Sequence, residues 1–339
     1  MTINSIITPR PLIQPNGQPL FAQFDTPVSD LAINQFDYRT VMDKRASAWA
    51  KYVHFKQFQF VSISHPQWQI GIALADIRYV GNAFCYFYDR QTNTLDEISL
   101  LKPPATGYQL SQSPVSGHSW VKGKQQIDVY FNGYNWQVKL NGALLQGDIE
   151  LQGLTSSQPL ALCTPTGYNG WTYTQKHNAL TLSGQLHYRG QSLDLTKALA
   201  GYDFSAGYMR RETSWRWGSI SAMLPHGRFG LNIAAGVNET GATENLYWLD
   251  EQRVLLPPVQ ITLDRQQPGS PWQFHSSDGQ LQLQFTPHAC RRERLNLGFL
   301  ASNFRQYCGF FSGTIQTADG GKLNLDQVPG LAEDHFARW

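Results

Sequence analysis

Tight-turn dipeptides flanked by alternating apolar residues constrain the fold of this chain more than any other feature. The stretch 127–151 reads IDVYFNGYNWQVKLNGALLQGDIEL and contains Asn132-Gly133 and Asn141-Gly142. Asn-Gly accepts the positive φ angles of tight hairpin turns, and apolar–polar alternation places one row of side chains on each face of a strand. The stretch therefore predicts a series of antiparallel hairpins.

Turn signals of the same kind recur between other alternating runs. They stand at Arg189-Gly190, at Ser277-Asp278-Gly279 and at Asp319-Gly320-Gly321. Two segments favour helix, residues 37–52 and residues 195–200. Many short strands joined by turn residues predict an all-β protein of the sandwich or barrel type, with few helices.

The length of the chain and one interruption of the β pattern predict two domains. With 339 residues, the chain exceeds the size at which a single hydrophobic core usually stops growing. The segment 196–208 is rich in Gly and Ala and breaks the alternation. We place the junction there and expect an N-terminal domain over residues 1–205 and a C-terminal domain over residues 206–339.

Charge and hydropathy argue against several classes of partner. Lys and Arg number 27 against 25 Asp and Glu, without a basic block, so a nucleic-acid partner is not expected. The sequence contains no run of about eighteen apolar residues, so an integral membrane segment is not expected. The N-terminal residues lack the basic and apolar regions of an export signal. We expect a cytoplasmic protein whose cysteines are all free thiols, because they are widely spaced: Cys85, Cys163, Cys290 and Cys308. The sequence leaves the oligomeric state open.

Motifs for cofactors and metals are absent from the sequence. It holds no G-x-G-x-x-G, phosphate-binding loop or G-x-S-x-G motif. The histidines show neither H-x-H nor H-x-x-x-H spacing. Glu333, Asp334 and His335 are adjacent, and neighbours on a strand point to opposite faces, so the three are poorly placed to bind one ion. We expect no cofactor and no metal.

The segment 208–219, YMRRETSWRWGS, packs arginines, a glutamate and tryptophans closely together. If it is a strand, alternation places Arg211, Trp215 and Trp217 on one face, while Arg216 belongs to the opposite, charged face. The tryptophan face is apolar, so this parity would carry Arg211 into the interior.

A buried guanidinium needs a partner, because an unpaired buried charge is costly. We therefore expect a carboxylate from residues 239–244 or 333–334 to hold Arg211. On this hypothesis Arg211→Ala destabilises strongly and Arg216→Ala does not. In the alternative interpretation the tryptophans are ordinary core residues and the arginines form surface ion pairs.

Long motifs in the C-terminal half resemble a known family. They are CTPTGYNGWTYTQK (163–176), GYMRRETSWRW (207–217), GVNETGATEN (236–245), RRERLNLG (291–298), SNFRQYCGFFSG (302–313) and PGLAEDHFARW (329–339). These motifs are similar to the family catalogued as DUF 2804, strongly over residues 160–339 and loosely before them. The order of the β-rich halves around a Trp-x-Trp strand more remotely resembles tandem lipocalin-like proteins such as carotenoid 1,2-hydratases and tocopherol cyclases. This resemblance implies two lipocalin-like antiparallel barrels or half-barrels in tandem, with an apolar ligand inside or between them.

Candidate site residues are the polar and aromatic side chains in and near these motifs. For proton transfer we name Tyr173, Glu212 and Glu244. The candidates for ligand binding are Trp171, Arg210, Arg211, Trp215, Trp217, Asn238, Asn245, Trp248, Arg305 and His335. In the alternative interpretation, Tyr173 packs at a barrel end and residues 236–245 form a solvated hairpin tip.

Three functions are compatible with these features. The first is a cofactor-independent enzyme that binds a lipid or isoprenoid-like molecule in a β-barrel cavity and hydrates, cyclises or isomerises it by acid/base chemistry. The second is a carrier or sensor with the same cavity and no chemistry. The third is a protein-interaction scaffold, which would have no enclosed cavity.

Overall fold

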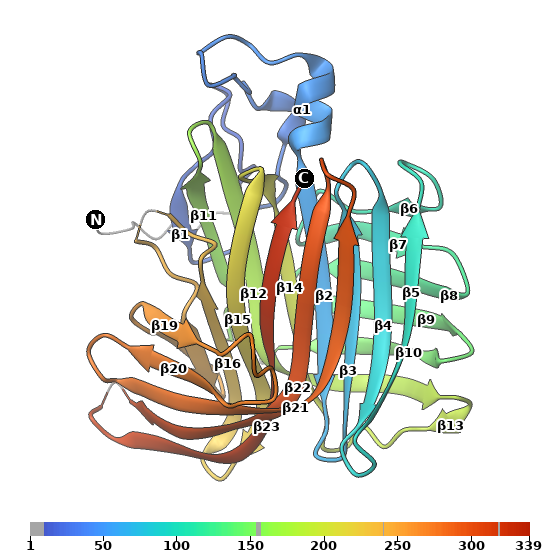
Figure 1. The fold of residues 1–339 in the computed structure, drawn as a ribbon, viewed down its shortest axis with the longest axis vertical. Helices are drawn as coiled ribbons and strands as arrows, with labels where there is room; N and C mark the ends of the chain where they lie inside the picture. The colour runs from blue at the N-terminus through green and yellow to red at the C-terminus, as the bar shows by residue number, and fades with distance from the viewer. Residues whose placement is uncertain (1–9, 154–156, 240, 318) are drawn as a thin grey trace.

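The computed structural model describes residues 10–153, 157–239, 241–317 and 319–339, and these residues fold into two antiparallel sheets (Figure 1). Eleven strands of the first sheet form a nearly closed barrel. In spatial order they are β5 (Thr94–Lys102), β4 (Gly81–Asp89), β3 (Trp68–Asp76), β2 (Lys56–Ser64), β14 (Leu199–Tyr208), β12 (Gly170–Tyr188), β10 (Leu145–Gln152), β9 (Asn135–Gly142), β8 (Gln125–Asn132), β7 (Ser116–Val121) and β6 (Tyr108–Gln109). Three further strands lie off this path: β1 (Ala22–Phe24), β11 (Leu160–Thr166) and β13 (Gln191–Ser192).

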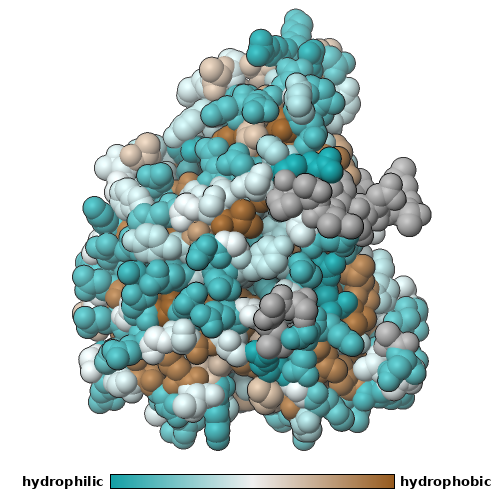
Figure 2. All heavy atoms as spheres, turned by 180° about the vertical axis from the view of Figure 1, so that it is seen from behind, coloured by the Kyte–Doolittle hydropathy of each residue, from teal (hydrophilic) through white to brown (hydrophobic). Residues whose placement is uncertain are grey.

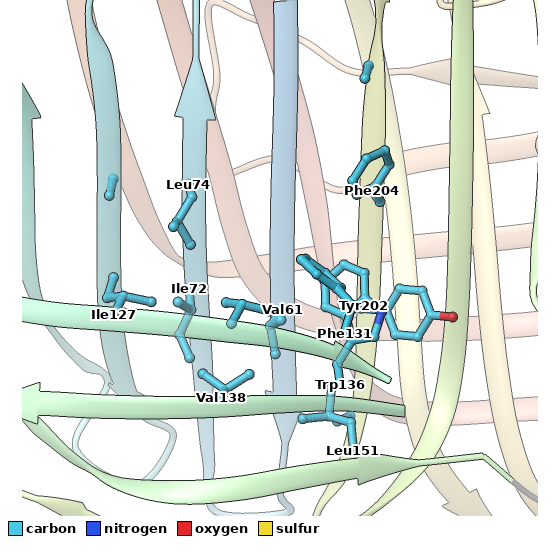
Figure 3. Close-up of a cluster of buried hydrophobic side chains, with 14 of the residues drawn as sticks. Val61, Ile72, Leu74, Ile127, Phe131, Trp136, Val138, Leu151, Tyr202 and Phe204 are labelled. Carbon is cyan, nitrogen blue, oxygen red and sulfur yellow. The ribbon is translucent and has the colours of Figure 1, made fainter. Parts of the chain in front are cut away.

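Large apolar side chains fill the part of the first barrel shown in Figure 3. Val61 and Ile72 from β2 and β3 face Val138 from β9 across the barrel (Figure 3). Trp136 stacks on Tyr202 with ring centroids 4.1 Å apart. This packing follows from the alternation of apolar residues along the strands, which sends every second side chain inward.

The second sheet is a half-barrel of nine strands. Their spatial order is β18 (Gln252–Leu255), β17 (Leu246–Leu249), β16 (Gly227–Ala235), β15 (Glu212–Leu224), β23 (Lys322–Arg338), β22 (Ala301–Gln316), β21 (Leu281–Asn296), β20 (Trp272–Ser276) and β19 (Val259–Thr262). Its own core gathers around Phe274, Phe285 and Phe311.

A third apolar cluster joins the two sheets. Tyr86 and Phe84 on β4 point away from the core of the first barrel. They pack in one cluster with Trp217 from β15, Cys308 from β22 and Leu331 from β23. The outer face of β2, β3 and β4 is therefore covered in large part by the second sheet.

The predicted hairpins are confirmed. Gly133 has φ 64° between β8 and β9, and Gly320 has φ 84° between β22 and β23. Asn141-Gly142 instead ends β9, with the turn just after it. The chain leaves the first sheet at Tyr208 and enters the second at Glu212.

Both helix predictions differ from the structure. The helix expected over residues 37–52 is shortened to α1 (Ala48–His54), because Asp43 takes a positive φ of 59° and Ser47 caps the helix by accepting a hydrogen bond from the Ala50 amide. A short 3₁₀ turn, η1 (Ile33–Gln35), precedes it. The helix expected over residues 195–200 is absent. It would be too short to be stable alone, and Leu199 already pairs with β2 as the first residue of β14.

The four cysteines are free thiols, as expected. Within the described ranges, no helix is both long and apolar enough to cross a bilayer. On the face turned away from the viewer of Figure 1, apolar residues form separate patches between hydrophilic ones (Figure 2).

Candidate functional site

A cavity of about 180 Å³ lies where the two sheets face each other. One wall comes from the outer face of β2, β3 and β4 and from parts of β12 and β14, and includes Phe58, Phe60 and Phe84. The other comes from β15, β22 and β23, and includes Trp215, Trp217 and Phe304 along its apolar part. The cavity therefore lies between the first barrel and the second sheet, while the barrel region in Figure 3 is filled with side chains.

The carboxyl group of Glu333 is the central polar group of this cavity. Its two oxygens accept hydrogen bonds from the indole Nε1 of Trp215 at 2.8 Å and from Nε2 of Gln306 at 2.9 Å. Burial raises the pKa of Glu333 to about 7, although both hydrogen bonds oppose this shift by favouring the carboxylate. A carboxyl group with this pKa can hold or release a proton near neutral pH.

Tyr86 fixes the amide that holds Glu333. Its hydroxyl donates to Oε1 of Gln306 at 2.8 Å, and the amide nitrogen of Gln306 then points at Glu333. Gly71 lies directly opposite Tyr86 in the ladder of β3 and β4, and a Cβ atom at Gly71 would collide with the tyrosine ring. Gly71 therefore provides the space in which the ring lies.

We expect Gly71→Ala to lower the free energy of unfolding by roughly 1–3 kcal/mol, because the buried Tyr86 ring has to shift in a packed interface. Gly269→Ala is the matched control, since nothing lies within 4 Å of a Cβ atom there, and it should change stability by less than about 0.5 kcal/mol. Urea unfolding of both variants measures the difference. Equal midpoints would show that Tyr86 can move freely.

A buried ion triad forms the floor of the cavity beside Trp217. Nζ of Lys176 lies 2.9 Å from Asp203 and 2.9 Å from Glu244. Burial alone would lower the pKa of Lys176, but the two carboxylates outweigh it and hold this pKa above its ordinary value. Burial also raises the pKa of Asp203, against the opposing effect of the lysine. The ammonium lies 5.8 Å from the centroid of the Trp217 ring, a distance typical of a cation–π contact.

His335 adds a neutral imidazole next to Glu333. Nε2 of His335 lies 3.0 Å from the hydroxyl of Ser302, and Nδ1 lies 3.9 Å from the Glu333 carboxylate. Burial lowers the pKa of His335 to about 3, so the imidazole is neutral at pH 7. Its ring packs against Trp215, with centroids 4.3 Å apart.

Arg291 closes the side of the cavity near Phe84. Its guanidinium stacks 3.7 Å from the centroid of the Phe84 ring. The same group pairs with Glu293 at 2.7 Å and Glu97 at 3.1 Å, so its charge is balanced by carboxylates. Both cations of the cavity, Lys176 and Arg291, are thus paired with carboxylates, and the remaining walls are mainly apolar.

Four of the residues chosen from the sequence line this cavity: Trp215, Trp217, Glu244 and His335. The shared face of the two tryptophans is confirmed, and so are the opposite faces of neighbours in 333–335: Glu333 and His335 line the cavity, while Asp334 pairs with Arg265.

The other chosen residues lie elsewhere. Trp171 and Tyr173 belong to the core of the first barrel, and Trp248 and Asn245 are buried structural residues whose side chains bond to backbone carbonyls. Glu212 is exposed and pairs with Arg338 at 2.7 Å. Three more lie at the edge of the cavity region or on its far side. Asn238 bonds to Glu244, Arg210 pairs with Glu239, and Arg305 faces Asp334.

The prediction that Arg211 points to the interior is wrong. The chain bends at Arg211 and β15 begins only at Glu212, so the alternation of the strand does not extend to Arg211. The guanidinium of Arg211 is exposed and donates to the carbonyl of Phe299 at 3.4 Å. It is Arg216, placed on the surface by the sequence analysis, that lies near a buried carboxylate, 3.8 Å from Asp334.

The residues chosen from the sequence do not include Lys176, Asp203, Gln306 or Tyr86, and Glu333 is considered there only as an ion-pair partner and as a poorly placed metal ligand. Alternation alone places Lys176 on the face of Thr172 and Thr174, where three polar side chains in a row on a buried strand signal a polar lining. No local signal marks Gln306 or Tyr86, because their partner lies far away in the sequence.

No group of three His, Cys, Asp or Glu side chains suited to a metal ion is present in the described ranges. The acid/base groups of the cavity are the protein's own carboxyl and imidazole groups. The arrangement can bind a compact apolar molecule and exchange a proton with it.

A nearly closed antiparallel barrel, followed by a half-barrel that encloses a cavity against its outer face, defines a tandem lipocalin-like β-protein. The chain belongs to the family described as "Domain of unknown function (DUF2804)", whose model matches residues 4–339. No curated protein matches the sequence.

Two solved structures share the fold. Kievitone hydratase from Nectria haematococca superposes with a TM-score of 0.50 at 11% identity, over 84% of this chain and 88% of that chain. CghA superposes with a TM-score of 0.55 at 10% identity, over 98% of this chain and 97% of that chain. At these identities the likeness concerns the fold, and the chemistry has to be argued from the residues of the cavity.

Proposed function

We propose that this protein is a cofactor-independent enzyme that transfers a proton to and from a compact apolar molecule, in a hydration, cyclisation or isomerisation. The observation that carries the proposal is Glu333, whose pKa of about 7 is set by burial among the aromatic side chains of the cavity. In its protonated form Glu333 acts as a general acid toward an electron-rich group of the ligand.

The hydrogen bonds around Glu333 support this role. When the proton moves to the ligand, the carboxylate that remains is stabilised by Nε1 of Trp215 and Nε2 of Gln306. The cycle closes when Glu333 takes a proton back from the cationic or hydrated ligand. His335 lies 3.9 Å from the carboxylate and is neutral, so it adds no positive charge that would favour ionisation of Glu333 before the proton is transferred.

The cavity volume narrows the class of substrate. At about 180 Å³ it is close to the roughly 150 Å³ of engineered cavities that bind one benzene ring. A molecule of one or two rings fits inside, while a long isoprenoid chain would extend out of the cavity. The aromatic walls favour a ligand that is itself flat or unsaturated.

The fold likeness to kievitone hydratase agrees with this proposal by analogy only. A carrier or sensor with the same cavity remains the second candidate, because the apolar walls alone explain binding. The two candidates differ in whether Glu333 is needed for a chemical change.

The test compares wild type with Glu333→Gln on the apolar molecule extracted from purified protein and identified by mass spectrometry. We expect both proteins to bind it, and only wild type to incorporate deuterium from ²H₂O into it or its product, with turnover in the variant reduced about 10²–10⁴-fold. Glu212→Gln, at an exposed carboxylate outside the cavity, should keep full turnover. Binding without deuterium incorporation in all three proteins would establish the carrier instead.

A further inference from the structure

A row of charged residues crosses the second sheet on the face that points away from the cavity. Four neighbouring strands place Arg292 opposite Arg305, Arg305 opposite Asp334, and Asp334 opposite Arg216. Residues directly opposite one another in antiparallel strands share a face. Glu333 and His335 line the cavity, so Asp334 and the arginines beside it occupy the reverse side of the same strands.

A fifth residue reaches this row from the other edge of the half-barrel. Arg265 follows β19 and binds Asp334 through two hydrogen bonds, from Nε at 2.9 Å and from an NH group at 2.7 Å. This fork uses both oxygens of the carboxylate. Each oxygen of Asp334 thus already accepts one hydrogen bond from Arg265.

The two arginines that flank Asp334 are left without hydrogen-bond acceptors. Arg216 and Arg305 each approach the carboxylate only to 3.8 Å, which is beyond a hydrogen bond. Among the residues that the structure describes, neither guanidinium donates a hydrogen bond, and Nε of Arg216 is buried without a partner. The side chain of Arg305 is only 12% exposed, so water offers it little compensation.

Charge is unbalanced at the same place. The guanidinium groups of Arg216, Arg265 and Arg305 share one carboxylate within 4 Å, which leaves two positive charges in excess. Arg292, the cross-strand partner of Arg305, adds a further cation to the row. Like charges held side by side on a sheet are destabilising unless an anion lies between them.

We propose that this arginine row is a binding site for a phosphate group, carried by a small metabolite or free in solution. A phosphate dianion matches the two excess charges around Asp334, and its tetrahedral oxygens can accept from the guanidinium groups of Arg216 and Arg305 at once. Arg265 and Asp334 form the fixed frame of the site. The site is separate from the cavity and does not depend on the enzymatic proposal.

The test uses inorganic phosphate as the probe, with isothermal titration calorimetry and thermal unfolding at constant ionic strength set by chloride. We expect saturable binding and a rise in Tm for wild type. Arg305→Gln and Arg216→Gln should each weaken phosphate binding about tenfold or more, because each loses a charge-assisted hydrogen bond. In chloride, Arg305→Gln should unfold at the wild-type temperature or above it, because a like-charge contact is relieved.

Arg338→Gln is the matched control: its partly exposed arginine pairs with Glu212 and lies outside the row, so its phosphate affinity should equal that of wild type. Succinate separates phosphate from carboxylate dianions. Saturation by succinate but not by phosphate would overturn the assignment, and so would a phosphate response that Arg305→Gln and Arg216→Gln leave unchanged. A free-phosphate site and a site for a phosphorylated metabolite are told apart by comparing the affinities for phosphate and for a simple phosphomonoester.

Discussion

Replacing Lys176 by methionine is expected to lower the free energy of unfolding by about 3–5 kcal/mol, the cost of leaving buried charges without their partner. The ammonium of the lysine pairs with both Asp203 and Glu244 at 2.9 Å, and the exposed fraction of its side chain is 7%. Methionine keeps the length and apolar surface of the side chain and removes only the ammonium. Denaturant unfolding at pH 7.5 measures the loss.

The pH dependence of this variant gives a second check on the cause. Burial raises the pKa of Asp203, and without the ammonium this carboxylate can take up a proton, so the deficit should shrink as the pH is lowered toward 5. Lys139→Met is the matched control, because Lys139 pairs with Asp148 at 3.2 Å on the surface, and its loss should be less than about 1 kcal/mol. A Lys176 variant no less stable than the Lys139 variant would contradict the triad as a buried, coupled unit.

The second large effect is the pH dependence that Glu333 imposes on stability. The folded protein holds the pKa of Glu333 at about 7, above its ordinary value of 4.5, because the side chain is buried. The folded state therefore binds this proton more tightly than the unfolded state. The contribution of Glu333 is most favourable below about pH 4.5, and it is lost as the pH rises toward 7, by roughly 3 kcal/mol in total.

Glu333→Gln removes this titration while keeping the shape of the side chain. The free energy of unfolding of the variant, minus that of wild type, should rise by roughly 3 kcal/mol between pH 4.5 and pH 8. All other titrating groups cancel in this difference. Parallel stability curves for the two proteins would mean that Glu333 is ionised throughout the range and is no acid at neutral pH.

Period-two alternation and turn residues predicted much of the fold. Asn132-Gly133 forms its hairpin because glycine accepts the positive φ that the turn requires. The shared face of Trp215 and Trp217 followed from the spacing of two residues. These inferences succeeded because they depend on neighbours within a few positions in the chain.

The site could be predicted only in part, because alternation states which residues share a face and not what covers that face. The outer side of β4 could have been exposed to water, and only the docking of the second sheet buries Tyr86 and makes Phe84 a cavity wall. Lys176 is buried because it pairs with carboxylates from distant segments, and no local sequence pattern predicts these pairs. Arg211 was misplaced because a single bend ahead of β15 ended the alternation.

The cavity lies at the junction of two sheets that each have their own hydrophobic core, and this position affects how selectivity for the ligand can change. Each core can repack without touching the ligand, yet a small tilt of one sheet against the other reshapes every wall of the cavity at once. A bound molecule also holds the two sheets together. At a free concentration of a hundred times its Kd, it adds about 2.7 kcal/mol to the stability of the folded protein with its sheets in contact. Relatives with the same inward-facing side chains can therefore accept different molecules, through differences that lie wholly in the angle between their sheets.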